Sequence, residues 1–217
     1  MKKILICGDS FCVTDPKFPM LHWSEKLLEK SENINVFNLA NQGCSNALIT
    51  EQLLRGLLLA PDFVILSFTA PLRFETDNNI DAKPYSLTAD DFKTYQASRY
   101  IMQASGTRAI VDKLKLSSRN FEELKNYFHI LTCLMTLQAQ NINFLFSLGG
   151  FEKNYTTLLR SNYVKNFIPL FDQKEMSINL WDHSDNTISK NVPIFHVSNG
   201  IIHDQFANEC LSRIDAE

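Results

Sequence analysis

Short apolar runs alternate along the chain with segments of helical periodicity. The apolar runs predict four buried strands, at residues 2–7, 35–40, 62–69 and 143–148. Between and after them, apolar residues recur every three or four positions and predict helices at residues 23–30, 47–59 and 121–140, with a last helix that carries Ile202, Phe206, Cys210 and Ile214. Strands that alternate with helices in this way indicate right-handed βαβ units and a parallel sheet.

A polar turn follows the first predicted strand. The run Ile4–Cys7 is apolar without alternation, which is typical of a strand that is covered on both faces, and Gly8-Asp9-Ser10 ends it. Glycine allows a sharp turn, and the turn brings a hydroxyl group to the carboxyl end of the strand. Open α/β sheets bind their ligands at that end, although an ordinary polar turn would have the same sequence.

Further polar segments are expected at this edge of the sheet, because the carboxyl ends of parallel strands lie together. Asn41–Asn46 follows the second predicted strand, and Thr69–Arg73 follows the third. His196 comes just before the last helix, which we expect Ser198 to cap. The sequence therefore brings a serine, a histidine and several hydrogen-bond donors to one place.

Residues 74–118 interrupt the alternation of strands and helices. The segment is polar and weakly periodic, and we interpret it as an insertion after the third strand. Insertions of this size near a site often form lids or substrate walls, but a plain surface excursion explains the pattern equally well. No linker, repeat or low-complexity tract divides the chain, so residues 1–217 are predicted to form a single domain.

Composition and charge narrow the class of protein. The chain has 217 residues, of which 45% are hydrophobic, and this is enough for a sizeable core. A net charge of −3 gives no reason to expect nucleic acid or an anionic membrane as a partner. No apolar stretch reaches transmembrane length and the first residues lack a signal-peptide pattern, which together predict a cytoplasmic protein.

The cysteines argue against a disulfide framework or a structural zinc site. They are odd in number, scattered and without a CxxC pair: Cys7, Cys12, Cys44, Cys133 and Cys210. Residues 181–185 (WDHSD) combine aspartate and histidine without an established ligand spacing, and a polar loop is the simpler interpretation. We therefore expect reduced thiols, no metal and no cofactor.

Three blocks of the sequence resemble the SGNH (GDSL-type) hydrolase superfamily. Gly8-Asp9-Ser10 is similar to the first block, and residues 38–43 (NLANQG) are similar to the second, a strand-end asparagine with a glycine five residues on. His196–Gly200, followed by Phe206-Ala207, is similar to the last block. The resemblance covers nearly the whole chain except the insertion. The sequences of these blocks are most similar to those of members encoded by tailed bacteriophages. Such an origin would place the protein in the host cytoplasm or in the virion.

The resemblance implies a three-layer α/β/α sandwich with a central parallel sheet, the flavodoxin-like fold of these hydrolases. It implies that Ser10 is the nucleophile and that His196 takes its proton, which are the groups that ester hydrolysis by a serine needs besides donors to the oxyanion. Those donors would be the main-chain N–H groups of Ser10 and Gly43, with Thr69 or Asn46 as a side-chain donor.

Two positions depart from the family's pattern. Thr69 stands where the third block usually has an asparagine in the oxyanion hole, and its hydroxyl donates one hydrogen bond with shorter reach; Asn46 is the alternative. Pro193 stands where the last block usually has an aspartate that orients the histidine, and a missing carboxylate can reduce the rate by orders of magnitude. Asp182 and Asp185 are carboxylates near it in the sequence.

His203 is a rival to His196 as the base, because the family places its histidine close to the last helix. It is predicted to lie within that helix, about 10 Å from the ring of His196, so both cannot reach Ser10. Asp9 is expected to bond N–H groups of its own loop rather than to act as an acid. Arg73 would bind an acidic group of the substrate or lie at the surface, and the other histidines receive no role.

The activity that the resemblance implies is hydrolysis of a carboxylic ester in a small molecule or a carbohydrate, including removal of an acetyl group from a sugar. Two alternatives are left open. A non-catalytic binding module on the same fold is favoured by Thr69 and Pro193. An acyltransferase would use the same serine and differ only in what accepts the acyl group.

Overall fold

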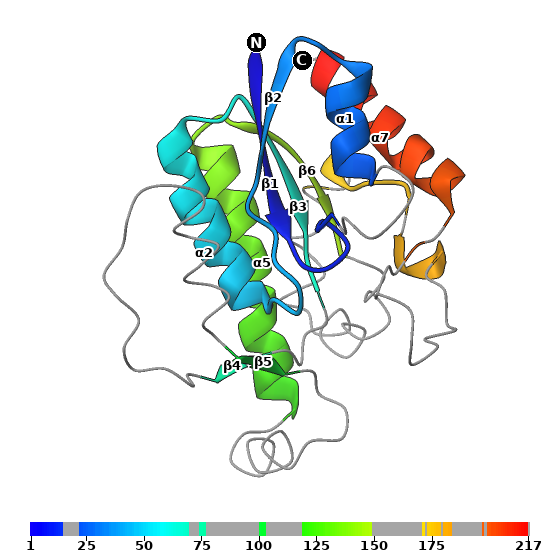
Figure 1. Cartoon of the computed structure of the whole chain (residues 1–217). Coiled ribbons are helices and arrows are strands. Elements are labelled where there is room, and N and C mark those ends of the chain that lie inside the picture. Colours follow the sequence, from blue (N-terminus) through cyan, green and yellow to red (C-terminus); the bar gives the residue numbers. More distant parts are fainter. Residues whose placement is uncertain are drawn as a thin grey trace.

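Four parallel strands form the central sheet of the protein. The computed structural model describes residues 1–14, 22–69, 74–76, 100–102, 119–148, 171, 173–178, 180–183, 197 and 199–216 (Figure 1). Within these residues the sheet consists of β1 (Lys2–Gly8), β2 (Ile34–Asn38), β3 (Phe63–Ser67) and β6 (Asn143–Ser147). Their order in space is β2-β1-β3-β6, and the predicted parallel α/β sheet is thereby confirmed.

The order of the strands changes direction at β1. The chain passes from β1 to β2 on one side and then crosses to β3 on the other side. At such a switch point, the loops that leave neighbouring strands diverge and open a crevice for a ligand beyond the carboxyl ends. The loops after β1 and β3 begin at Asp9 and Phe68, so Ser10 lies at this point.

Helices cover both faces of the sheet. On one face lie α2 (Asn46–Gly56) and α5 (Arg119–Ala139), which pack against each other (Figure 1). On the other face lie α1 (Trp23–Lys30) and α7 (Gly200–Asp215), which also pack together. The two pairs of helices and the sheet between them form three layers, as the resemblance implies.

The residues of β1 alternate between the two cores that result. Leu5 and Cys7 belong to the core beneath α2 and α5, whereas Ile4 and Ile6 belong to the core beneath α1 and α7. All four are fully buried. A strand covered on both faces has no polar position, which is why the apolar run identifies it.

Helical spacing predicts that Leu28, Phe128 and Met135 face the core, but all three are exposed. Phe128 and Met135 of α5 are 57% and 53% exposed, and Leu28 of α1 is 49% exposed. In α5 the buried stripe runs through Tyr127 and Leu134, one position earlier. Two neighbouring apolar stripes on one helix have the same period, so spacing alone does not decide which one meets the sheet.

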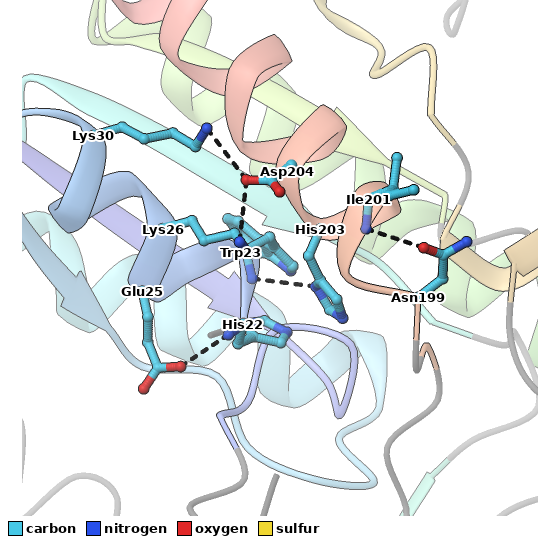
Figure 2. Close-up of polar contacts among 9 residues, drawn as sticks. All are labelled: His22, Trp23, Glu25, Lys26, Lys30, Asn199, Ile201, His203 and Asp204. Carbon is cyan, nitrogen blue, oxygen red and sulfur yellow. Dashed lines mark hydrogen bonds and ion pairs between the residues drawn. The ribbon is translucent and has the colours of Figure 1, made fainter. Parts of the chain in front are cut away.

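The helix caps differ from the prediction at one place. Ser45 caps α2 by accepting the Leu48 N–H at 3.3 Å. The cap of α7 is Asn199 rather than Ser198, because the Asn199 side chain accepts the Ile201 N–H at 3.0 Å (Figure 2). The difference of one residue does not change where the helix begins relative to the sheet.

Between β3 and α5, the described residues are two short strands. They are β4 (Phe74–Thr76) and β5 (Tyr100–Met102), which pair antiparallel. Both fall within the predicted insertion, and α5 begins directly after it, as expected. The predicted role of the insertion as a lid is untested. Residues 151–169, whose sequence predicts a further helix, lie outside the described residues.

Short helical turns complete the description. Leu57–Leu59 forms a 3-10 turn, η1, that continues α2, and Leu180–His183 forms another, η4. The polar sequence of residues 176–193 predicts a loop, whereas residues 180–183 within it form this helical turn. Met176 is buried, and its N–H donates to the Phe146 carbonyl oxygen at 2.8 Å, which extends pairing at the β6 edge.

Candidate active site

The turn after β1 is held by two hydrogen bonds. The Cys12 N–H donates to the Asp9 carbonyl oxygen at 3.0 Å, and the Phe11 N–H donates to Asp9 Oδ1 at 3.1 Å. The expected role of the Asp9 carboxylate in its own loop is thereby confirmed. Ser10 lies inside this turn and is half-buried, so its backbone position is fixed by the bonds around it.

Gly8 is enclosed by the groups around the turn. A Cβ atom at Gly8 would lie 2.6 Å from Cys12 Sγ and 3.1 Å from Ser67 Cβ, which leaves no room for a side chain. The fully buried Gln52 of α2 binds the main chain of Gly8: Oε1 accepts the N–H at 2.7 Å, and Nε2 donates to the carbonyl oxygen at 3.1 Å. The pairing of β2 with β1 ends at Ile6; beyond it the Gly8 carbonyl oxygen still accepts the Asn41 N–H at 3.2 Å, and Gln52 supplies the acceptor for the Gly8 N–H.

Replacing Gln52 with methionine is expected to lower the free energy of unfolding by about 2–3 kcal/mol, because the buried Gly8 N–H loses its acceptor. Urea denaturation measures this loss. Leu54→Met, at a half-exposed position of the same helix, is the control and should change stability by less than about 0.5 kcal/mol. Equal stability of the two variants would mean that Gln52 does not hold Gly8.

The loop after β3 is bonded to both other loops. Thr69 Oγ1 donates to Asp9 Oδ2 at 2.8 Å. Asn46, the first residue of α2, accepts the Thr69 N–H at 2.9 Å and donates to the Thr69 carbonyl oxygen at 3.1 Å. Its Nδ2 also lies 3.3 Å from Asn126 Oδ1, and all these polar side chains are buried. The predicted convergence of the three loops is confirmed.

These bonds engage the two side chains predicted to donate to an oxyanion. A threonine hydroxyl has one hydrogen, and that of Thr69 goes to Asp9. Both amide hydrogens of Asn46 have protein acceptors. Either side chain would therefore have to leave a buried bond before it could bind an oxyanion. Their oxyanion role stays a prediction; the bonds that the structure has hold the loops together.

Gly43 lies in the turn between β2 and α2. Its φ angle is 72°, in the left-handed region that favours glycine over every other residue. The end of β2, just before this turn, is bonded to the turn that holds Ser10, because Asn38 Nδ2 donates to the Cys12 carbonyl oxygen at 2.7 Å. The conformation explains the glycine, and donation from its N–H to an oxyanion stays a prediction.

Other predicted residues cannot be placed. His196, Arg73, Pro193 and Asp185 lie outside the described residues. Asp182 belongs to η4, but its side chain is outside the described part as well. Their assignments as base, substrate ligand and orienting carboxylate stay predictions.

A pair of buried histidines lies next to the turn that holds Ser10, and sequence reasoning did not identify it. His22 and His203 are each 2% exposed, and the centroids of their rings lie 5.0 Å apart (Figure 2). His22 Nδ1 accepts the Ser24 N–H and caps α1, while Nε2 lies 3.0 Å from the Phe11 carbonyl oxygen and carries the proton. Glu25, three residues after His22, completes a capping box and is the sequence signal for it.

Both ring nitrogens of His203 are engaged in hydrogen bonds. Nδ1 accepts the Trp23 N–H at 3.2 Å, and Nε2 lies 2.9 Å from the Val197 carbonyl oxygen, so the proton is on Nε2. His203 belongs to α7, as expected. A general base needs its lone pair directed at the substrate, and that of His203 is used inside the core.

Burial keeps both histidines neutral. Burial, followed by the neighbouring His203, lowers the pKa of His22 to about 3. Burial also lowers the pKa of His203; its bond to Val197 opposes this, Lys26 adds to it and Asp204 opposes it. Lys26 and Asp204 form an ion pair of 3.1 Å beside them (Figure 2).

The histidine pair is expected to make the fold sensitive to acid. The unfolded chain binds a proton at His22 below pH 6.5, whereas the folded chain does not until about pH 3. Stability from the neutral ring is therefore present above pH 6.5 and falls as the pH decreases, by about 2 kcal/mol between pH 7 and pH 5. Urea denaturation at both pH values measures this loss. His22→Asn, which keeps a capping oxygen, should lose less; an equal loss would exclude His22 as the source.

The described residues give no support to a cysteine nucleophile or to a metal site. All five cysteines are buried, and burial raises the pKa of Cys133 to about 12 and that of Cys7, Cys12 and Cys210 as well, so these thiols stay protonated. In this part of the chain, no group of three or more His, Cys, Asp or Glu residues is arranged to hold a metal ion. None of its helices combines the length and the apolar character needed to cross a membrane.

Known proteins of similar structure were found, but no protein-family model and no curated protein sequence matches the chain. The psychrotrophic esterase EstA from Pseudoalteromonas sp., crystallised with monoethylphosphonate as inhibitor, has a TM-score of 0.54 and 13% identity over 100% of this chain and 98% of its own. A protein from Bacillus subtilis has a TM-score of 0.50 and 10% identity, over 99% of this chain and 56% of its own.

A lipolytic protein of the G-D-S-L family from Veillonella parvula has a TM-score of 0.49 and 11% identity, over 98% of this chain and 97% of its own. At such identities the comparison concerns the fold. The resemblance to bacteriophage members stays a prediction. The chain has a three-layer α/β fold similar to that of the Pseudoalteromonas esterase over its full length.

Proposed function

We propose that this protein is a serine-dependent hydrolase of carboxylic esters. The observation that carries the proposal is the position of Ser10, in a turn fixed by Asp9 at the switch point of a parallel sheet. Ligands of open α/β sheets bind at that point. The fold shared with an esterase agrees with this assignment.

In the proposed reaction, Ser10 Oγ attacks the ester carbonyl carbon, and His196 takes the hydroxyl proton. The tetrahedral intermediate collapses, the alcohol leaves with the proton from the imidazole, and the acyl group stays on Ser10. Water then attacks this acyl ester while His196 takes a proton from it. The carboxylic acid leaves, and Ser10 regains its hydrogen.

We assign the oxyanion hole to the main-chain N–H groups of Ser10 and Gly43. Main-chain donors at fixed positions stabilise developing charge without reorganisation. Thr69 and Asn46 are then supporting residues, because their donors are engaged by Asp9, Asn126 and the Thr69 carbonyl oxygen. An esterase without the usual asparagine donor would be slower, by about 10²–10³-fold for one donor.

The preferred substrate is proposed to be a small acyl ester, such as an O-acetyl group on a carbohydrate, with Arg73 near an acidic part of the molecule. The orienting carboxylate for His196 would come from Asp182 or Asp185, since Pro193 cannot supply one. Both assignments rest on the resemblance of the sequence blocks.

A panel of substrates tests the proposal. Hydrolysis of p-nitrophenyl acetate, butyrate and octanoate, and of acetylated sugars, is followed with and without an added sugar acceptor. Hydrolysis that falls with acyl length supports the acetyl assignment. Transfer to the added sugar in preference to water would favour the acyltransferase, and saturable sugar binding without turnover would favour the binding module.

A further inference from the structure

The hydrogen bonds of His203 join two separate parts of the chain. Its Nε2–H donates to the carbonyl oxygen of the buried Val197, the residue that follows His196 in the sequence. Its Nδ1 accepts the main-chain N–H of Trp23, at the start of α1 (Figure 2). One side chain of α7 thus binds the main chain of two other segments.

Trp23 and its neighbour His22 extend this connection to the turn after β1 that contains Ser10, the Ser10 turn. Trp23 Nε1–H donates to the Phe11 carbonyl oxygen at 2.9 Å, and His22 Nε2–H donates to the same oxygen at 3.0 Å. Phe11 directly follows Ser10, and its own N–H is bonded to Asp9. A continuous path of hydrogen bonds therefore runs from the segment before α7 to the residue after Ser10.

We propose that His203 is a positioning residue, which holds the Ser10 turn and the segment at Val197 in a fixed relation to each other. This role rests on the proposed function, in which His196, next to Val197, takes the proton of Ser10. Both bonds of His203 go to main-chain atoms, so its removal would leave the Trp23 N–H and the Val197 carbonyl without this partner in the core. A displacement of about 1 Å in a site can reduce the rate about 10²-fold.

Hydrogen–deuterium exchange of the full chain tests this connection without any need for activity. His203→Leu removes both bonds, and exchange should become faster at the same time in peptides that cover residues 8–14 and 197–203. Cys210→Ala is the control, because Cys210 is equally buried in α7 and two turns further on. It should affect only its own surroundings.

Conservative variants separate the two ends of the path. Asparagine places an oxygen near the position of the histidine Nδ1, so His203→Asn should keep the Trp23 bond and leave residues 8–14 protected. Glutamine places a nitrogen near the position of Nε2, so His203→Gln should keep the Val197 bond instead. If His203→Leu does not fold, these two variants carry the test, and loosening of residues 8–14 in His203→Asn but not in His203→Gln would overturn the role.

The rate of reaction with a fluorophosphonate gives the second measurement. His203→Leu should react about 10–100-fold more slowly, His203→Asn and His203→Gln should lie between, and Cys210→Ala should match the unchanged protein. Unchanged exchange at residues 8–14 in His203→Leu, or an unchanged reaction rate, would overturn the positioning role. A wild-type protein that does not react would count against the proposed function, and exchange would still decide the role of His203.

Discussion

Replacing Ser10 with alanine is expected to reduce kcat/KM for ester hydrolysis by at least about 10³-fold, because the substitution removes the attacking oxygen. The turn itself should persist, since Asp9 holds it through main-chain and carboxylate oxygens. The free energy of unfolding should therefore change by less than about 1 kcal/mol. Initial rates and urea denaturation of the same preparation measure the two effects.

Ser212→Ala is the matched control for this prediction, because Ser212 is exposed near the end of α7 and its hydroxyl donates to the Glu209 carbonyl oxygen of the preceding turn. Its kcat/KM should equal that of the unchanged protein. If Ser10→Ala kept more than a tenth of the activity while Ser212→Ala kept all of it, the nucleophile would be another residue.

Replacing His196 with alanine is expected to reduce kcat/KM by about 10³-fold or more, whereas His203→Ala should cost about 10–100-fold. The difference follows from the roles assigned to the two residues. His196 is proposed to transfer protons, while both ring nitrogens of His203 bond the main chain inside the core.

The dependence of the rate on pH distinguishes the two histidines further. Loss of the base at His196 should remove the titration of kcat/KM near neutral pH, because the general base of the free enzyme controls it. His203→Ala should keep that titration. The reverse pattern would show that the last block was aligned wrongly, and equally small losses in both would favour the binding module.

The sheet could be predicted from the sequence because burial on both faces leaves a clear mark. β1 is apolar at every position from Ile4 to Cys7, and its residues alternate between the two cores. The bounds of α1, Trp23–Lys30, also match the prediction, since Trp23 and Leu27 face one side. In both cases the spacing of apolar residues within one segment was sufficient to predict the element.

Packing faces and one cap could not be predicted in the same way. Phe128 and Met135 are as apolar as the buried residues of α5, and only contact with the sheet selects between the two stripes. His22 is not among the usual N-cap residues, because its nitrogen accepts only in the neutral ring. Burial, which maintains that form, is a property of the folded chain.

The convergence of loops in the candidate site could be predicted, but the partners of its side chains could not. The positions of Ser10, Gly43 and Thr69 after parallel strands place their loops at one edge of the sheet. The bond of Thr69 to Asp9 joins residues that are 60 positions apart and depends on distances within the folded protein. From the sequence alone, Thr69 could therefore not be identified as the hydrogen-bond partner of Asp9.

The site of covalent reaction with a fluorophosphonate tests the role of Ser10 most directly. Mass spectrometry of the digested protein should find a single adduct, on the peptide that contains Ser10, and Ser10→Ala should carry none. An adduct on a different residue, or equal labelling of Ser10→Ala and the unchanged protein, would contradict the assignment of Ser10 as the nucleophile.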